Sequence, residues 1–139
     1  MTTAREIMTA DPHTLREDQT LVEAARLMRD QGIGAVPVVA ADGSLVGIVT
    51  DRDIAIRGVA DGGDLTSMSI GGLAQGIVST VGPEEDINRI VDTMGGQQVK
   101  RLPVMEGGNL VGIISEADLA RHVADDHVVH FVQMVYGRG

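Results

Sequence analysis

Apolar residues recur at helical spacing in two stretches of the chain. The first stretch begins at Thr20, which forms a capping-box pattern with Glu23, and Gly32 is a natural C-terminal stop. The second begins at Asp86 and ends near Gln97. The apolar positions follow the i, i+3, i+4, i+7 rule and are Leu21, Ala24, Ala25 and Met28, then Ile87, Ile90, Val91 and Met94. The pattern predicts two amphipathic helices.

Two apolar runs follow each predicted helix and are separated by turn residues. Gly, Asp, Asn and Ser in the joins are typical of β-hairpins. The runs are residues 33–39 and 45–49, then residues 99–105 and 110–114. A second helix is predicted after each hairpin, over residues 52–59 and 117–123. The order strand, helix, strand, strand, helix occurs twice, which predicts an α/β (α+β) fold of two pseudo-symmetric repeats, each a small sheet packed by two helices.

The two halves of the chain also match residue by residue. Thr14 recurs as Thr80, 66 positions later, and the match continues with one residue deleted as far as Asp53 and Asp118, which are 65 positions apart. Two copies of a unit that cannot bury its apolar face alone imply a pseudo-symmetric pair with a shared core.

The repeats give the predicted domain organisation. Residues 1–65 form the first repeat with its connector, and residues 66–124 form the second. Glycines in residues 58–64 make this stretch the expected flexible connector. The tail, residues 125–139, carries spaced apolar residues that predict a helix packing on the body or on another subunit.

Composition and charge exclude several classes of function. A net charge of −9 without a basic cluster argues against nucleic-acid binding, and one Phe and one Tyr are too few for a base-stacking platform. No apolar run approaches the ~18 residues that span a membrane, and the first residues lack the apolar core of a signal peptide. We therefore expect a cytoplasmic protein that binds neither nucleic acid nor membrane.

No catalytic arrangement is present in the sequence. The chain has no cysteine, no Gly-x-Ser-x-Gly elbow, no phosphate-binding P-loop and no paired-histidine metal motif. We therefore expect that the protein is not an enzyme.

Both repeats contain the motif Gly-apolar-apolar-(Thr/Ser)-x-x-Asp, at residues 47–53 and 112–118. Thr50 and Ser115 are good helix N-caps, and the acidic residue three positions later completes a capping box without any ligand. The same geometry also presents N–H groups and a hydroxyl to a phosphate, while Asp53 or Asp118 can accept two ribose hydroxyls. The motif alone favours capping.

The doubled motif, together with the Ala-Val-Pro-Val and Arg-Leu-Pro-Val strands, resembles tandem cystathionine-β-synthase (CBS) domains, the Bateman module. The resemblance covers about residues 7–123 and is similar to stand-alone bacterial two-repeat proteins of the actinobacterial hypoxic-response type. It implies a regulatory sensor that binds an adenosine nucleotide (AMP, ADP or ATP, sometimes S-adenosylmethionine) between the repeats. It also implies a homodimer, for which the apolar tail is a second indication. The chain carries no effector domain of its own, so any output would pass through a separately encoded partner.

The resemblance assigns a role to each matching residue. Asp53 and Asp118 would hold the ribose hydroxyls, and Thr50 and Ser115 would meet the phosphate. The expected cations for the phosphate are Arg52, Lys100 and Arg101. The expected base contacts are Thr14, Leu15, Ala35, Val36 and Pro37 in one site, and Thr80, Val81, Leu102 and Pro103 in the other. We expect no cofactor and no metal, with an adenosine nucleotide as the ligand.

The two repeats differ in charge at the candidate site. Lys100 and Arg101 occupy the positions of Gly34 and Ala35, Arg52 is matched by Ala117, and Arg57 by His122. We therefore expect two unequal sites, one of which can be empty. A solvated hairpin edge explains Lys100 and Arg101 equally well.

Two further alternatives stay open. His122, His127 and His130 lie close in sequence, but two imidazoles without a nearby third ligand make a poor metal site, so surface or packing roles are favoured over metal binding. The chief alternative to a sensor is a ligand-free structural or interaction protein that keeps the fold and the capping boxes.

Overall fold

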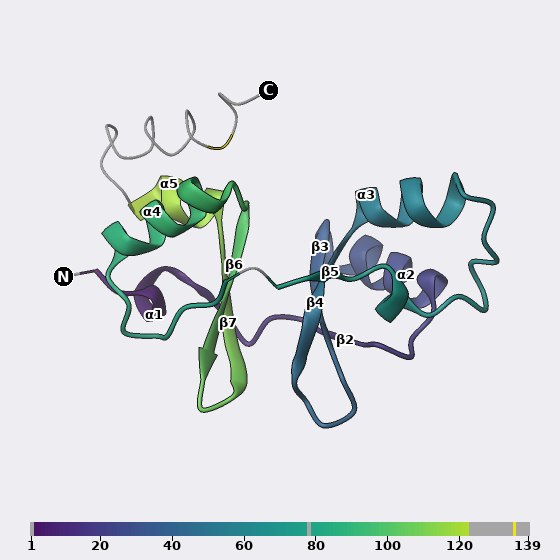
Figure 1. Cartoon of the computed structure of the whole chain (residues 1–139), viewed down its shortest axis with the longest axis horizontal. Coiled ribbons are helices and arrows are strands. Elements are labelled where there is room, and N and C mark those ends of the chain that lie inside the picture. Colours follow the sequence, from purple (N-terminus) through teal and green to yellow (C-terminus); the bar gives the residue numbers. More distant parts are fainter. Residues whose placement is uncertain (1, 78, 123–134, 136–139) are drawn as a thin grey trace. The chain divides into compact units, whose positions relative to one another are not determined.

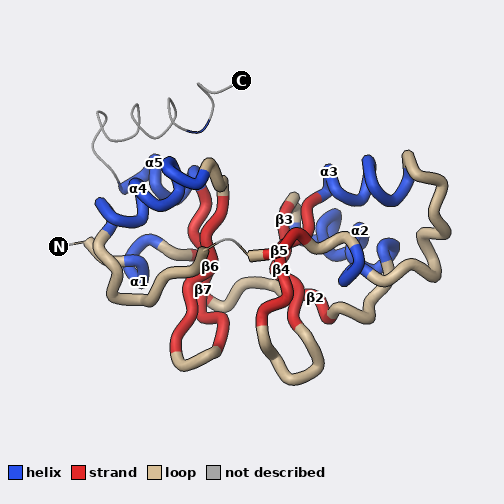
Figure 2. Tube along the Cα trace, viewed as in Figure 1, coloured by secondary structure: helices blue, strands red, loops and turns tan. Residues whose placement is uncertain are grey.

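Two units of similar element order account for the chain, and we call residues 13–77 the first unit and residues 1–12 with 78–139 the second unit. The computed structural model describes residues 2–77, 79–122 and 135. Within each unit the helices lie on one side of a small sheet (Figures 1 and 2). This arrangement confirms the fold class predicted from the sequence.

The first unit has a four-stranded sheet in the order β2-β3-β4-β5. The pair β2–β3 is parallel, and the pairs β3–β4 and β4–β5 are antiparallel. Along the chain its elements are β2 (Leu15–Arg16), α2 (Leu21–Gln31), β3 (Ala35–Val39), β4 (Leu45–Thr50), α3 (Asp51–Asp53), the π-helical segment η1 (Ile54–Val59), the 3₁₀ turn η2 (Ile70–Gly72) and β5 (Gln75–Gly76).

The second unit has a three-stranded antiparallel sheet in the order β1-β7-β6. In place of β2 it has a single parallel bridge between Val81 and Val104. Its elements are α1 (Ala4–Ile7), β1 (Thr9–Ala10), α4 (Ile87–Gln97), β6 (Arg101–Glu106), β7 (Asn109–Ser115) and α5 (Glu116–His122).

Each unit takes a short segment from the other half of the sequence. Residues 1–12, with α1 and β1, belong to the first repeat of the sequence, but β1 pairs with β7. Residues 66–77, with η2 and β5, belong to the second repeat, but β5 pairs with β4. We call these two stretches the exchanged segments. The backbone hydrogen bonds of these segments repeat with the same 66-residue offset: the Ala4 N–H donates to the Glu85 carbonyl (2.9 Å), and the Ile70 N–H donates to the Gln19 carbonyl (2.7 Å). The compact units therefore differ from the division at residue 65, which stays a prediction about the sequence repeats.

The helix start and stop signals act as the sequence predicts. Thr20 and Glu23 form both hydrogen bonds of the capping box, and Gly32 ends α2 in the left-handed conformation with φ 65°. The Asp86 carboxylate accepts a hydrogen bond from the Asn88 N–H at 2.8 Å and begins α4.

The helices that follow the hairpins differ slightly from the prediction. The segment expected at 52–59 begins one residue earlier as α3 and continues as η1, in which the Ala60 N–H donates to the Ala55 carbonyl at 2.9 Å. This i+5 bond widens the turn into π geometry. The helix expected at 117–123 begins one residue earlier, as α5.

The exchanged segments contribute to the cores of both units. Ile70 and Leu73 pack in the first core, and Ala4 and Ile7 pack in the second. Val135 packs against the second core, while the rest of the predicted tail lies outside the described residues. In the part of the chain that the structure describes, no helix has the length and apolarity needed to cross a membrane.

Gly58 lets η1 approach α2 closely. A Cβ added at Gly58 would lie 2.5 Å from Cδ2 of Leu21, a core side chain. We predict that Gly58→Ala lowers the free energy of unfolding by about 1–3 kcal/mol, the usual cost of overpacking. Urea unfolding measures this change. Gly72→Ala is the matched control, because a Cβ there meets nothing within 4 Å. Equal stability of the two variants would contradict close packing at Gly58.

Candidate functional site

The end of β4 is joined to the helix after it by a hydroxyl and a carboxylate. The Asp53 Oδ2 atom accepts hydrogen bonds from the Thr50 N–H (2.8 Å) and the Thr50 hydroxyl (2.9 Å). In return, the Asp53 N–H donates to Thr50 Oγ1 at 3.1 Å. This reciprocal capping box satisfies backbone groups that a helix start otherwise leaves unpaired.

The second unit repeats this junction between β7 and α5. The Asp118 Oδ2 atom accepts from the Ser115 N–H (2.8 Å) and the Ser115 hydroxyl (3.0 Å), and the Asp118 N–H donates to Ser115 Oγ at 3.2 Å. Asp53 is 5% exposed and Asp118 is 4% exposed, and they are the buried acidic residues of the described chain. Buried carboxylates are stable only when hydrogen-bonded or paired, as these are.

The strand register brings further candidate residues to each junction. Ala35 stands opposite Thr50 on the neighbouring strand, and Arg101 stands opposite Ser115. The carbonyl of Lys100 accepts the first helical N–H of α5, from Glu116, at 3.1 Å. The second unit therefore has a half-buried arginine opposite its hydroxyl residue, where the first unit has an alanine.

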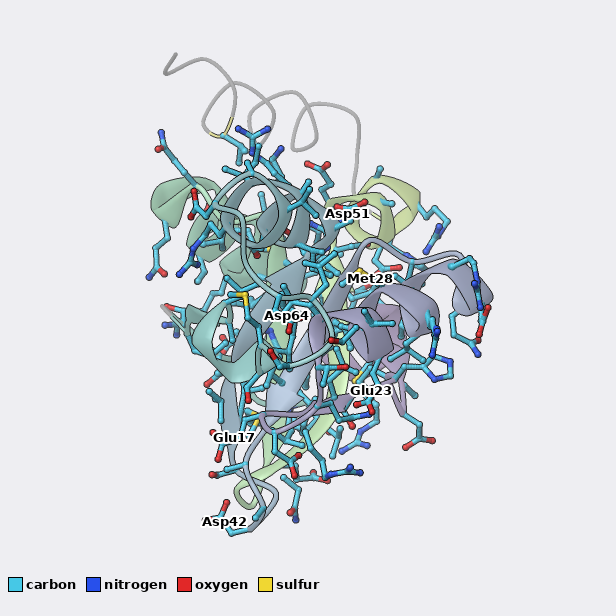
Figure 3. The ribbon with its side chains drawn as sticks, turned by 90° about the vertical axis from the view of Figure 1, so that its right-hand side faces the viewer. Glu17, Glu23, Met28, Asp42, Asp51 and Asp64 are labelled. Atoms are coloured by element: carbon cyan, nitrogen blue, oxygen red, sulfur yellow. The ribbon has the colours of Figure 1, made fainter. Side chains whose placement is uncertain are left out.

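The junction of the first unit lies at the open end of the β3–β4 hairpin. Figure 3 shows Asp42 at the hairpin turn and Asp51 at the opposite end, where β4 runs into α3. In the turn, the Ser44 hydroxyl and N–H donate to the Asp42 carboxylate and hold its pKa below the usual value. The turn and the candidate site are thus separated by the length of the hairpin.

The residues expected to contact the base fall into two groups. Leu15, Val36 and Leu102 are core residues, at most 2% exposed, and Val81, Pro37 and Pro103 are also buried. Thr14 and Thr80 are exposed, and Ala35 is half-buried. The backbone of this sheet edge already carries hydrogen bonds, such as the one from the Val81 N–H to the Pro103 carbonyl at 3.1 Å.

Two arginines have contacts that the sequence analysis missed. Arg121 donates to Oδ1 of Asp118. Arg57 donates to the carbonyls of Leu73 (3.1 Å) and Gly72 (3.4 Å), and so fastens η1 to the exchanged segment. The i, i+3 spacing of Asp118 and Arg121 was a usable signal for the first contact, because residues three apart on a helix are neighbours.

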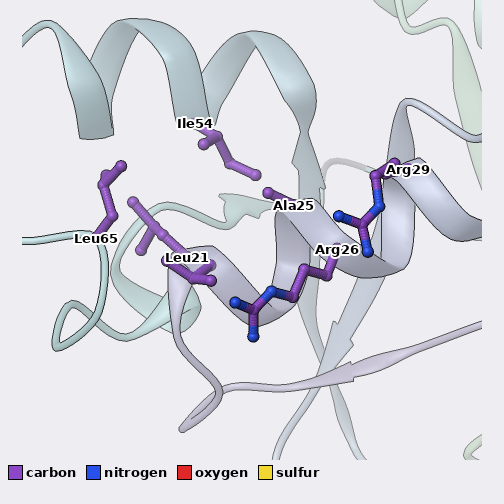
Figure 4. A pocket seen from close by; sticks show the side chains of 7 residues that line it. Leu21, Ala25, Arg26, Arg29, Ile54 and Leu65 are labelled. Carbon is purple, nitrogen blue, oxygen red and sulfur yellow. The ribbon is translucent and has the colours of Figure 1, made fainter.

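A hollow of about 220 Å³ lies elsewhere in the first unit, between α2 and η1 (Figure 4). Arg26 and Arg29 stand at an otherwise apolar lining of Leu21, Val22, Ala25, Ile54 and Leu65. None of the residues assigned to the nucleotide is among them.

Within residues 2–77 and 79–122, no group of three or more His, Cys, Asp or Glu side chains is placed to hold a metal ion. The His122 Nδ1 atom lies 3.0 Å from the Asp118 carbonyl on its own helix, and His13 is exposed. The metal-site alternative that involves His127 and His130 falls outside the described residues.

Comparison with known proteins identifies relatives of the whole chain. A family model for the CBS domain matches residues 4–58 and 74–125. The chain is 42% identical to Hypoxic response protein 1 of Mycobacterium tuberculosis over 97% of its length and 94% of that protein. It also resembles a CBS domain pair of the protein MJ0100 solved with 5-methylthioadenosine and S-adenosyl-L-methionine, with a TM-score of 0.75 and 26% identity over 87% of this chain and 94% of that one. None of these names states a reaction.

A solved structure corrects the expectation of no cofactor and no metal. The structure of Hypoxic Response Protein I, 42% identical, has a TM-score of 0.80, covers 88% of this chain and 100% of its own, and holds two coordinated zinc ions. The expectation relied on motif spacing in the sequence. Zinc accepts histidine and carboxylate ligands as well as thiolates, and a fold can gather them from distant positions, so spacing is a weak guide.

The capping role of the hydroxyl gives a direct test of the junction. We predict that Thr50→Ala lowers the free energy of unfolding by about 1 kcal/mol, because the Asp53 N–H loses its acceptor. Thr50→Ser keeps the hydroxyl and should restore most of the loss. Chemical denaturation of the three proteins measures this, and a Ser variant as unstable as the Ala variant would show that the hydroxyl is not the stabilising group.

Proposed function

The chain belongs to the CBS-domain family as a tandem pair of CBS domains, a regulatory module, and from this premise we propose that it senses an adenine nucleotide. The observation that carries the proposal is the repeated junction, a buried carboxylate held by a hydroxyl where a strand meets a helix. Such a carboxylate accepts hydrogen bonds, and the vicinal hydroxyls of a ribose are donors.

The neighbouring groups suit the other parts of a nucleotide. Thr50 and Ser115 stand at helix starts, where backbone N–H groups can receive a phosphate. Arg101, opposite Ser115, adds a cation for a phosphate in the second unit. Since Leu15, Val36 and Leu102 belong to the cores, we propose that adenine recognition uses backbone groups and the half-buried Ala35 and not those side chains.

The proposed output is a change of arrangement and not a chemical reaction. A ligand that binds one arrangement of the module more tightly than another shifts the population toward it. We propose that this shift, in conformation or in the association of a homodimer, is read by a separately encoded protein. The related pair solved with 5-methylthioadenosine and S-adenosyl-L-methionine supports an adenine-containing ligand.

A ligand-free interaction protein of the same fold is the second candidate. It is favoured by one observation, which is that both capping boxes are complete within the chain and need no ligand for stability.

Isothermal titration with AMP, ADP, ATP and S-adenosylmethionine separates the two candidates. We expect saturable binding that weakens about 10- to 100-fold in Asp53→Asn or Asp118→Asn, because a hydrogen bond to a charged group contributes about 1.5–3 kcal/mol. Asn keeps an oxygen for the cap, and Asp92→Asn, at an exposed position of α4, is the charge-matched control.

The titration is run on EDTA-treated and on zinc-loaded protein, because a related structure holds two coordinated zinc ions. No heat with any of the four compounds in either form would exclude the nucleotide sensor and favour the interaction protein. If the Asp53, Asp118 and Asp92 variants all bind the ligand with the same affinity as the unmodified protein, neither Asp53 nor Asp118 is part of the binding site.

A further inference from the structure

We propose that Arg121 is a built-in competitor for the ribose at the second unit, where its ion pair with Asp118 lowers the affinity for a nucleoside. The proposal rests on the proposed function, since it takes Asp118 as a ribose acceptor. It concerns a residue to which neither the motif nor the sequence analysis assigns a role.

The contact occupies the carboxylate oxygen that does not take part in the capping box. Arg121 Nη2 donates to Asp118 Oδ1, while Ser115 donates twice to Oδ2. An ionised carboxylate has about four lone-pair sites, and these three bonds fill all but one. A ribose donates two hydroxyls, so both can reach Asp118 only if Arg121 leaves.

The burial of the two partners allows this exchange. The side chain of Asp118 is 6% exposed and that of Arg121 is 64% exposed. The carboxylate therefore stays in place, and the guanidinium can turn into solvent without breaking a core contact. Ligand binding replaces an ion pair by hydroxyl hydrogen bonds, and the lost ion pair lowers the affinity.

The first unit has no cation at the corresponding position. Ile56 stands 65 positions before Arg121, just as Asp53 stands 65 positions before Asp118. Ile56 is aliphatic and 49% exposed, so the position is open to substitution and the side chain forms no ion pair. Of the two helices that follow the hairpins, only that of the second unit therefore carries an arginine three positions after the carboxylate.

Adenosine is the probe, because it has the ribose and no phosphate that Arg121 could attract. Binding to the second unit is measured in an Asp53→Asn background, with and without Arg121→Ala. We expect adenosine to bind about fivefold more tightly without Arg121, the upper range for a partly exposed ion pair. Arg89→Ala removes another exposed arginine of the same unit, paired with Glu85, and should change nothing.

Salt gives a readout that a purely structural role would not move. Between about 0.01 and 1 M salt the screening length falls from about 30 Å to about 3 Å, which weakens the Arg121–Asp118 pair. Adenosine affinity of the Asp53→Asn protein should rise with salt, and the rise should disappear in Arg121→Ala.

The outcomes separate failure of this proposal from failure of the proposed function. Adenosine binding that depends on Asp118 but is unchanged or weakened by Arg121→Ala overturns the competitor and leaves the nucleotide sensor intact. Absence of adenosine binding in every variant, including Arg121→Ala, overturns the competitor, and the titration with AMP, ADP, ATP and S-adenosylmethionine then decides separately whether the nucleotide sensor fails as well. Tighter, salt-independent binding in Arg121→Ala supports the proposal.

Discussion

The junction between the second strand of each hairpin and the helix after it depends on one hydroxyl–carboxylate pair. Thr50 with Asp53, and Ser115 with Asp118, exchange three hydrogen bonds each, between a half-buried hydroxyl residue and a buried aspartate. The pair ends the strand, begins the helix, and keeps a carboxylate inside the protein in a satisfied state. The neighbouring strand of each hairpin is in fixed register with the hydroxyl residue that ends the second strand. The position of the hydroxyl–carboxylate pair therefore determines which residues surround the candidate site.

The second constraint is the exchange of short segments between the two halves of the chain. The β1 and β5 strands are only two residues long, yet each completes the sheet edge of the unit formed by the other repeat. Ala4 and Ile70 lie fully buried in the cores that these segments complete. The stability of either unit therefore depends on residues from both halves of the sequence. The two repeats consequently form one module and not two separable domains.

Local signals in the sequence predicted the local elements well. The capping box at Thr20 and the left-handed Gly32 act through neighbours in the chain, so periodicity and residue type were sufficient for α2. The exchanged strands could not be predicted, because two residues carry no alternation and their partners are more than 25 positions away. The candidate carboxylates were identified from the doubled motif, whereas the role of Arg57 depends on a backbone carbonyl 16 positions away and leaves no pattern. The expectation of no metal relied on the spacing of histidines, and zinc ligands that folding brings together need not be close in sequence.

The central claim is that Asp53 and Asp118 are ribose acceptors as well as helix caps. A crystal structure of the protein grown with a saturating adenine nucleotide tests it most directly. The account predicts that the two ribose hydroxyls lie within about 3 Å of a carboxylate oxygen of Asp53 or Asp118, with the capping hydrogen bonds intact. A nucleotide bound with its ribose away from both carboxylates would contradict the claim.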